Sequence, residues 1–408
     1  MVDESRLIDG ISLIRVVDGL PPAIGGSITH PIELSRKMNS LLKKQLIIAP
    51  SKNIKDGDFE NSFEVPIAKV YYPENLERFK QLKLPVAPFK IWIYSKSVSK
   101  KIEENSKDFD IVYVHGTLLG AMIGWHLKKS NVRIPLVILQ HSSNPFKISI
   151  RSALMERLAP FFFKFSKPNF LLIVDDGGEL EETLTLYKKH GILHEVVYHA
   201  IDTDFFSPCG DRKKNDIFTI LSTQRLDSFK RVDLGILAFK KFLEELNHYG
   251  NPKGQRTAKF IIIGDGKQRA GLEELVEKEN INHLVEFKGR KTTKEVRDYL
   301  RIADVVVGTS LKSNLNLSIQ EAMSCGRAVV AFDAGRTRSL IRCNYNGILV
   351  PPNDIDGFAK ALLQLYQNEA LRDELGRNAR KTIIDSRNWD SRIKIEMQLL
   401  ERIVRNKS

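Results

Sequence analysis

The stretch from Asp304 to Ile341 constrains the fold of this chain most strongly. It opens with DVVV, a short β-branched run typical of a strand that is buried on both faces. A polar loop, Thr309 to Asn316, follows, and apolar residues then recur at helical spacing up to Cys325-Gly326, where the glycine predicts a helix end. Ala328 to Phe332 is a second buried run. The pattern is therefore strand, loop, helix and strand, and free backbone N–H groups at the start of such a helix can bind a phosphate.

Glu321 lies one turn inside this predicted helix. Its carboxylate can accept hydrogen bonds from the hydroxyl groups of a sugar. An ordinary strand–helix–strand unit with a solvent-facing glutamate explains the same residue equally well, so both interpretations stay open at this point.

Buried apolar runs alternate with helical patterns along the rest of the chain. In the first half, strands are predicted at Ser12–Val17, Leu46–Ala49, Ile67–Tyr72, Ile111–Val114, Pro135–Leu139, Phe170–Val174 and Glu195–Tyr198. In the second half, they are predicted at Ile217–Ser222, Phe260–Ile263, Leu284–Phe287, Val305–Val307, Ala328–Ala331 and Ile348-Leu349, before a helical tail from Asp354 to Lys407. This alternation predicts mostly parallel, doubly wound α/β sheets, whose ligands lie outside the carboxyl ends of the strands.

The segment from Ile201 to Asp216 interrupts the alternation. It is polar, contains Pro208 and Gly210, and is typical of an interdomain linker. A chain of 408 residues is long enough for two domains of about 200 residues each. We therefore expect an N-terminal domain over residues 1–205 and a C-terminal domain over residues 206–387, two similar α/β domains that face one cleft.

Composition and charge exclude several classes of protein. Hydrophobic residues make up 42% and charged residues 28% of the chain, as in soluble globular proteins, and no run reaches the ~20 apolar residues of a membrane span. The acidic start lacks the order of a signal peptide, and three cysteines without metal spacing predict neither a disulfide framework nor a metal site, so we expect a cytoplasmic protein. The net charge is +13, and residues 206–408 carry most of it, with 36 Lys and Arg against 26 Asp and Glu. This excess suits a polyanionic ligand in the second half, although solubility explains it too.

Two cations, Arg225 and Lys230, follow the first predicted strand of the second half, at its ligand-facing end. Placed five residues apart on one loop, they can hold a diphosphate and neutralise it as it departs. A solvated basic loop is the plainer alternative.

Glycines mark two further turns between a strand and a helix. Gly264-Asp265-Gly266 follows the run FIII and permits close approach of the backbone to a ligand, but its spacing differs from the GxGxxG pattern, which argues against a nicotinamide cofactor. Gly25 and Gly26 precede the first long helix, predicted from Thr29 to Leu42, and would let backbone amides reach a ligand from the first domain. A plain glycine turn is the alternative.

Two histidines stand at the carboxyl ends of predicted strands. His115 follows DIVYV and His141 follows PLVILQ, so both belong to the expected ligand edge, although buried structural histidines are commoner. The stretch from Lys147 to Phe165 mixes basic residues with a phenylalanine-rich face, which can rest on an anionic membrane surface or pack in a core.

Taken together and in this order, these segments resemble the retaining glycosyltransferases of family 4 (glycosyl transferases group 1), which have the two-domain GT-B fold. The similarity runs along nearly the whole chain, through PPAIGGSITHPIELSRKM, VILQHSSNP, HAIDTDFFSP, the loop with Arg225 and Lys230, IIIGDG, EFKGR and SIQEAMSCGRAVVAFDAG. It implies an enzyme that moves a sugar from a UDP-, GDP- or ADP-linked donor to a saccharide, a lipid-linked glycan or a small molecule.

The resemblance also implies roles for individual residues. His141 would lie beside the reacting sugar, Arg225 and Lys230 would hold the donor diphosphate, and Glu321 would bind the donor ribose. The other donor-binding positions would be Gly25, Gly26, Gly264, Arg290 and Lys291 near the base, Ser313, and Asn316 and Leu317 near the distal phosphate. Positive side chains and helix dipoles would replace a metal ion, so no cofactor is expected. The helix at about residues 388–408 would cross back onto the first domain.

Three positions depart from the family pattern. Ser313 replaces the first of the family's paired carboxylates, Asn316 replaces the glycine three residues beyond it, and His199-Ala200 replaces the Asn-Gly of the linker. Because that first carboxylate commonly holds the hydroxyls of the donor sugar, the identity of the donor stays open. Two alternatives to an active transferase also stay open, a non-catalytic sugar-nucleotide-binding or scaffold protein and a nucleotide-sugar epimerase of the same fold. No nucleic-acid partner is expected, whereas peripheral contact with a membrane is left open.

Overall fold

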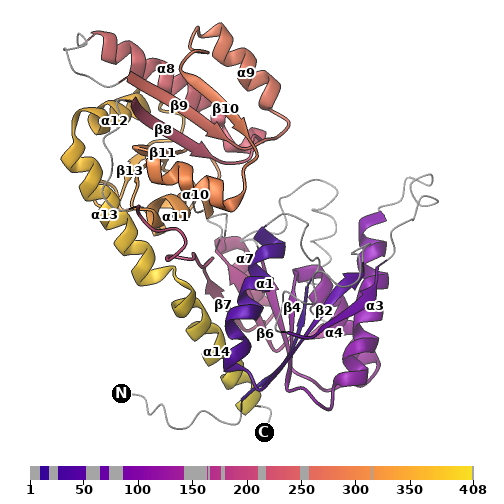
Figure 1. Ribbon diagram of the computed structural model, residues 1–408. Helices are drawn as coiled ribbons and strands as arrows, with labels where there is room; N and C mark the ends of the chain where they lie inside the picture. The colour runs from indigo at the N-terminus through magenta and orange to yellow at the C-terminus, as the bar shows by residue number, and fades with distance from the viewer. Residues whose placement is uncertain are drawn as a thin grey trace, which may run out of the picture. The chain divides into compact units, whose positions relative to one another are not determined.

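The computed structural model describes residues 10–17, 26–51, 65–72, 86–141, 163, 166–175, 180–209, 217–248, 257–313, 315 and 317–406, and every structural statement below concerns these residues. They form two compact units (Figure 1). The first unit comprises the described residues within Met1–Asp175, Leu180–Tyr198 and Arg392–Ser408, and the second those within His199–Ser391.

The first unit is built on a parallel sheet of seven strands. Their order across the sheet is β3-β2-β1-β4-β5-β6-β7, so the order reverses between β1 and β4. The strands are β1 (Ser12–Val16), β2 (Lys44–Ser51), β3 (Ile67–Tyr71), β4 (Ile111–His115), β5 (Leu136–Gln140), β6 (Phe170–Val174) and β7 (His194–Val197). Every residue of β1, β4, β5 and β6 is buried, which explains why apolar residues predominate in these strands.

Helices cover both faces of this sheet (Figure 1). Its helices are α1 (Gly26–Met38), the short η2 (Asn39–Leu41), α3 (Val86–Asn105), α4 (Thr117–Lys129), α7 (Leu180–Lys189) and α14 (Trp389–Arg405). One face packs Ile14, Val114 and Ile138 against α3 and α4. Helix α4 approaches β5 closely because it carries glycine at position 120, where a Cβ would lie 2.7 Å from the Ile138 side chain. The opposite face is polar in part, and α1 and α14 lie against it.

The second unit is built on a parallel sheet of six strands in the order β10-β9-β8-β11-β12-β13, which reverses between β8 and β11. The strands are β8 (Ile217–Thr223), β9 (Thr257–Ile263), β10 (Val285–Gly289), β11 (Val305–Gly308), β12 (Ala328–Phe332) and β13 (Ile348–Val350). The helices are η5 (Ser228–Lys230), α8 (Val232–His248), α9 (Arg269–Lys278), α10 (Thr293–Ile302), α11 (Leu317–Ser324), η6 (Thr337–Ser339), α12 (Ile355–Gln367) and α13 (Glu369–Ser386). Separate apolar clusters fill its two faces, as in a doubly wound sheet.

The tail, predicted as helical throughout, consists of three helices separated at two asparagines. The Asn368 side chain accepts a hydrogen bond from the Leu371 amide and so starts α13. Asn388 accepts one from the Ser391 amide at 2.7 Å at the start of α14. Asn368 also ends α12, whereas Arg387 is the C-cap of α13; each Asn side chain satisfies an amide that a helix start leaves free. No helix in the described part of the chain is long and apolar enough to span a membrane.

The segment that follows β7, predicted as a linker, is well packed over its described part. Ile201 and Phe206 are buried in the second unit, and the Ser324 hydroxyl donates to the Phe206 carbonyl. From Arg392 onward α14 belongs to the first unit, where Arg392 donates to the Tyr198 carbonyl. The stretch Lys147 to Phe165, predicted as a membrane-surface or core segment, lies almost wholly outside the described residues.

Candidate active site

In the second unit, two loops meet where the strand order reverses. The loop after β8 and the loop after β11 are joined by the Gln224 amide, which donates to the Thr309 hydroxyl at 2.8 Å. The Thr309 hydroxyl in turn donates to the Lys230 carbonyl at 2.8 Å. Ligands of doubly wound sheets bind at such a reversal, beyond the carboxyl ends of the strands. The structure therefore brings the predicted Arg225–Lys230 loop to the expected ligand edge of its unit.

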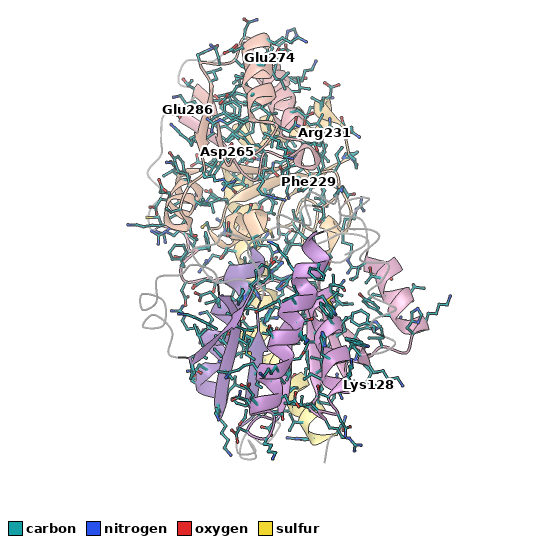
Figure 2. The ribbon with its side chains drawn as sticks, turned by 90° about the vertical axis from the view of Figure 1, so that its right-hand side faces the viewer. Lys128, Phe229, Arg231, Asp265, Glu274 and Glu286 are labelled. Carbon is teal, nitrogen blue, oxygen red and sulfur yellow. The ribbon has the colours of Figure 1, made fainter. Side chains whose placement is uncertain are left out.

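Three cations surround the ring of Phe229 on these loops. The Arg225 guanidinium carbon lies 5.6 Å, the Lys230 Nζ 5.2 Å and the Lys312 Nζ 5.7 Å from the ring centre. The Arg225 side chain is 71% exposed and pairs with Asp227 at 3.3 Å. The neighbouring Arg231, labelled with Phe229 in Figure 2, is instead engaged by Asp233 at 2.9 Å. The arrangement concentrates positive charge at one point, as binding of a phosphate group requires.

The predicted glycine turn after β9 supports this loop from the side. Gly264 has φ +139°, and a Cβ there would lie 2.1 Å from the Gln224 carbonyl oxygen. The Leu226 amide donates to the carbonyl of Asp265, a residue labelled in Figure 2, at 3.0 Å. Gly264 is thus required for the close contact between two loops, because any side chain would push the Arg225 loop away.

Glu321 lies one turn inside α11, as the sequence predicts. It is partly exposed, and burial raises the pKa of its carboxyl to about 7. Among the described residues its carboxylate has neither a hydrogen-bond donor nor a cation as a partner. A ligand that brings hydroxyl groups would supply the missing donors and favour the ionised form.

Ser313 stabilises the loop in front of α11. Its hydroxyl accepts a hydrogen bond from the Leu315 amide at 3.1 Å, and its own amide donates to the Ser310 hydroxyl at 3.4 Å. The Gln320 amide group fixes the same loop by donating to the Leu315 carbonyl at 2.9 Å. Ser313 therefore serves the loop conformation, and Leu317 begins the helix that follows it. Asn316 and Gly25, two predicted donor-binding positions, lie outside the described residues.

The two cations predicted near the base differ in their surroundings. Lys291 pairs with Glu295 at 3.0 Å, and Glu295 forms a capping box with Thr292 at the start of α10. Arg290 is exposed on the loop between β10 and α10. Lys291 is thus held by the helix that follows it, whereas Arg290 stands at the carboxyl end of its strand facing solvent.

In the first unit, His115 ends β4 and His141 immediately follows β5. Their rings stack, with centres 5.4 Å apart and an angle of 25° between the planes. Burial, and then the charge of Arg392, lower the pKa of His141 to about 4. Both ring nitrogens of His141 are buried and have no hydrogen-bond partner in the described part of the chain, whereas His115 Nε2 lies 3.0 Å from Arg15 Nη1. His115 is thus engaged by the protein, and His141 is a neutral imidazole with uncommitted nitrogens. Gly26 lies in the first turn of α1.

Two charged residues near these sites, Arg15 and Lys312, were not among the predicted site residues. Arg15 stands inside the apolar run SLIRV, and a lone arginine in such a strand is a signal of a buried polar partner. Lys312 joins the cations around Phe229 only through the fold, since it comes from the loop after a different strand.

Two doubly wound parallel sheets, each with its strand order reversing beside polar loops, give the chain the α/β architecture of the GT-B fold. A glycosyltransferase from Rickettsia africae ESF-5 has a TM-score of 0.72 at 16% identity, over 98% of this chain and 100% of that one. Anabaena HepE, solved in complex with UDP-glucose, has a TM-score of 0.67 at 16% identity, over 97% and 100%.

Residues 210–382 match the family model of glycosyl transferases group 1. An uncharacterized glycosyltransferase of Methanocaldococcus jannaschii is 24% identical over 360 residues, which make up 88% of this chain and 90% of that protein. Residues 210–382 thus carry a glycosyl transferases group 1 domain, and the predicted family resemblance, fold class and enzyme class are confirmed.

Proposed function

We propose that this glycosyltransferase moves a sugar, with retention of the anomeric configuration, from a nucleoside-diphosphate sugar to a saccharide, lipid-linked or small-molecule acceptor. The observation that carries the proposal is the group of three cations around Phe229, on loops fixed to one another at the strand reversal. A donor of this class leaves as a nucleoside diphosphate, and the departing group gains negative charge as the bond to the sugar breaks. Cations held at that position stabilise the transition state more than the ground state.

Arg225 and Lys230 would bind the diphosphate, and Glu321 would accept hydrogen bonds from the ribose hydroxyls. The remaining donor-binding proposals are Gly264, Arg290, Lys291, Ser313, Asn316, Leu317 and the Gly25-Gly26 turn. No step in this scheme needs a metal ion, because the cations and the start of α11 offer positive charge to the phosphates.

His141 would act on the sugar. A neutral imidazole can accept a hydrogen bond from a sugar hydroxyl and donate another, and so orient the anomeric carbon as positive charge develops on it. The low pKa of His141 suits this role, because it keeps the imidazole neutral. A protonated imidazole would repel the positive charge that develops on the anomeric carbon.

The donor nucleotide is tested first with UDP, because a structural neighbour was solved with UDP-glucose. Calorimetric titrations with UDP, GDP and ADP, followed by hydrolysis assays of the matching sugars without acceptor, separate the candidates. Donor binding with slow hydrolysis supports the transferase. Donor binding without any turnover in the presence of acceptor mixtures favours the scaffold, and interconversion of the donor sugar favours the epimerase. We propose a cytoplasmic location; fractionation of cells tests it, and binding to anionic vesicles decides between a peripheral membrane contact and none.

A further inference from the structure

A buried layer of charged and aromatic side chains lies beside the two histidines of the first unit. Arg15 of β1, Tyr113 of β4 and Glu396 of α14 are fully buried, and Arg392 of α14 is 3% exposed. Fully buried charges are rare in proteins and persist where other groups hold them. The layer is therefore a specific arrangement of the fold, and the proposed chemistry of His141 does not by itself explain it.

The Arg15 guanidinium is held from several sides. Its Nε donates to Gln45 Oε1 at 3.3 Å, its Nη2 contacts Met38 Sδ at 3.3 Å, and its carbon lies 4.7 Å from the centre of the Tyr113 ring. These contacts come from β2, α1 and β4. The remaining nitrogen, Nη1, lies 3.0 Å from His115 Nε2. These contacts hold the Arg15 guanidinium in one position, in which Nη1 faces His115 Nε2.

The contact with Arg15 decides the protonation of His115. A guanidinium can only donate hydrogen bonds, so His115 Nε2 must be the acceptor and the ring proton must reside on Nδ1. Burial and the charge of Arg15 also lower the pKa of His115 well below its ordinary value. His115 is thus a neutral ring with one tautomer, and the His141 ring stacks on it at 5.4 Å.

The net charge around the two rings favours neutral imidazoles. Arg15 from β1 and Arg392 from α14 bring two positive charges, and Glu396 brings one negative charge, which Arg392 Nε engages at 2.6 Å. His30 of α1 and Tyr113 of β4 also face the layer. Counted over the residues that the structure describes, these three groups leave one net positive charge, so a proton on either histidine would add to it.

We infer that Arg15 is a positioning residue for His141, because its hydrogen bond to His115 fixes the ring against which His141 stacks. This inference rests on the proposed function of His141. Arg15 does not touch substrate in this scheme. It acts through His115, and its loss would leave His141 with a partner ring of undefined tautomer and orientation.

Histidine 15N spectra of the whole protein test the inference directly. In the natural protein at pH 7, His115 is expected in the Nδ1–H tautomer and His141 as a neutral ring. A natural protein in which His115 carries its proton on Nε2 would overturn the inference without any variant.

The decisive variant is Arg15→Met, which keeps much of the side-chain volume and removes both charge and donors. We expect a mixture of tautomers at His115, displaced His141 signals, UDP affinity unchanged within about twofold, and turnover lowered about 10- to 100-fold. Arg133→Met is the matched control, since Arg133 is exposed and precedes β5 at the end opposite to His141. It should leave every signal and rate unchanged.

Arg15→Lys keeps the charge and one donor, so it should recover part of the Nδ1–H tautomer and part of the turnover. The same variant carries the test if Arg15→Met does not fold. Unchanged His115 and His141 signals in a folded Arg15 variant would refute the inference. So would equal losses of donor affinity and turnover. The spectra do not depend on sugar transfer, so a natural protein that transfers no sugar would contradict the proposed function alone.

Discussion

The Glu321 carboxyl gives the most quantitative test of the donor site. Burial raises its pKa from the ordinary 4.5 to about 7. Between these two values the folded protein holds the proton more tightly than the unfolded chain does, so the free energy of unfolding falls as the pH rises through this window. The full shift would correspond to ~3 kcal/mol, and because Glu321 is partly exposed we expect ~1–2 kcal/mol.

The perturbation is Glu321→Gln, which keeps the shape of the side chain and removes its titration. Urea unfolding at pH 5 and at pH 8 gives the free energy of unfolding of both proteins. Relative to the variant, the natural protein should lose ~1–2 kcal/mol between the two pH values. Glu274→Gln is the control, because Glu274 is exposed on α9 (Figure 2) and should behave like the natural protein.

Donor binding should show the opposite pH dependence. Ribose hydroxyls donate to the ionised carboxylate, so UDP-sugar affinity of the natural protein should rise as the pH increases through 7. Glu321→Gln should lose this dependence and bind about 10- to 100-fold more weakly at pH 8, from a charged hydrogen bond of about 1.5–3 kcal/mol. Calorimetry measures both effects. Identical pH dependence of stability in the two proteins, or affinity that falls with rising pH, would refute the assignment of Glu321 to the ribose.

Three further outcomes are expected. Replacing Arg225 and Lys230 together by alanine should abolish UDP binding in calorimetry without lowering the melting temperature, since each cation contributes roughly 1.5–3 kcal/mol through charge-assisted hydrogen bonds; unchanged affinity would contradict their role. His141→Ala should lower kcat far more than donor affinity, and the assignment is wrong if His115→Ala is the more damaging change while His141→Ala is nearly silent. On the proposal that Ser313 lies beside the donor sugar, it leaves more room and less negative charge there than a glutamate would, so a donor panel should favour N-acetylated or uronic sugars over glucose and mannose, and a preference for plain hexoses would show this reasoning to be wrong.

Much of the fold could be predicted because its strands are buried on both faces. Phe170–Val174 was predicted to the residue and the strand at Ala328 to within one residue, since each is an uninterrupted apolar run bounded by polar residues. Helix boundaries were less exact. The helix expected from Thr29 to Leu42 begins at Gly26 and ends in a separate short turn, η2, because a helical pattern marks the buried face and not the residues that open and close the helix.

The candidate site was predictable only where one loop supplies its residues. Arg225 and Lys230 were found because both follow the same strand. The ring of Phe229 between three cations was not, since Lys312 arrives from the loop after β11, and only the strand order β8-β11 brings the two loops together. The raised pKa of Glu321 was likewise inaccessible, because it depends on which atoms surround the carboxyl in three dimensions.

The two units use positive charge in physically different ways. Arg225 is 71% exposed on a loop, where water screens its charge and the side chain can follow an incoming phosphate. Arg15 is fully buried and held by several contacts, so its guanidinium is already in place and does not have to move during a reaction. On the proposed function, exposed cations would therefore supply capture of the donor, and the buried layer would supply orientation at the reacting sugar. A buried arginine in an apolar strand makes the folded protein less stable than an apolar side chain of similar volume would. The requirement for one fixed histidine ring gives a physical reason for this loss of stability.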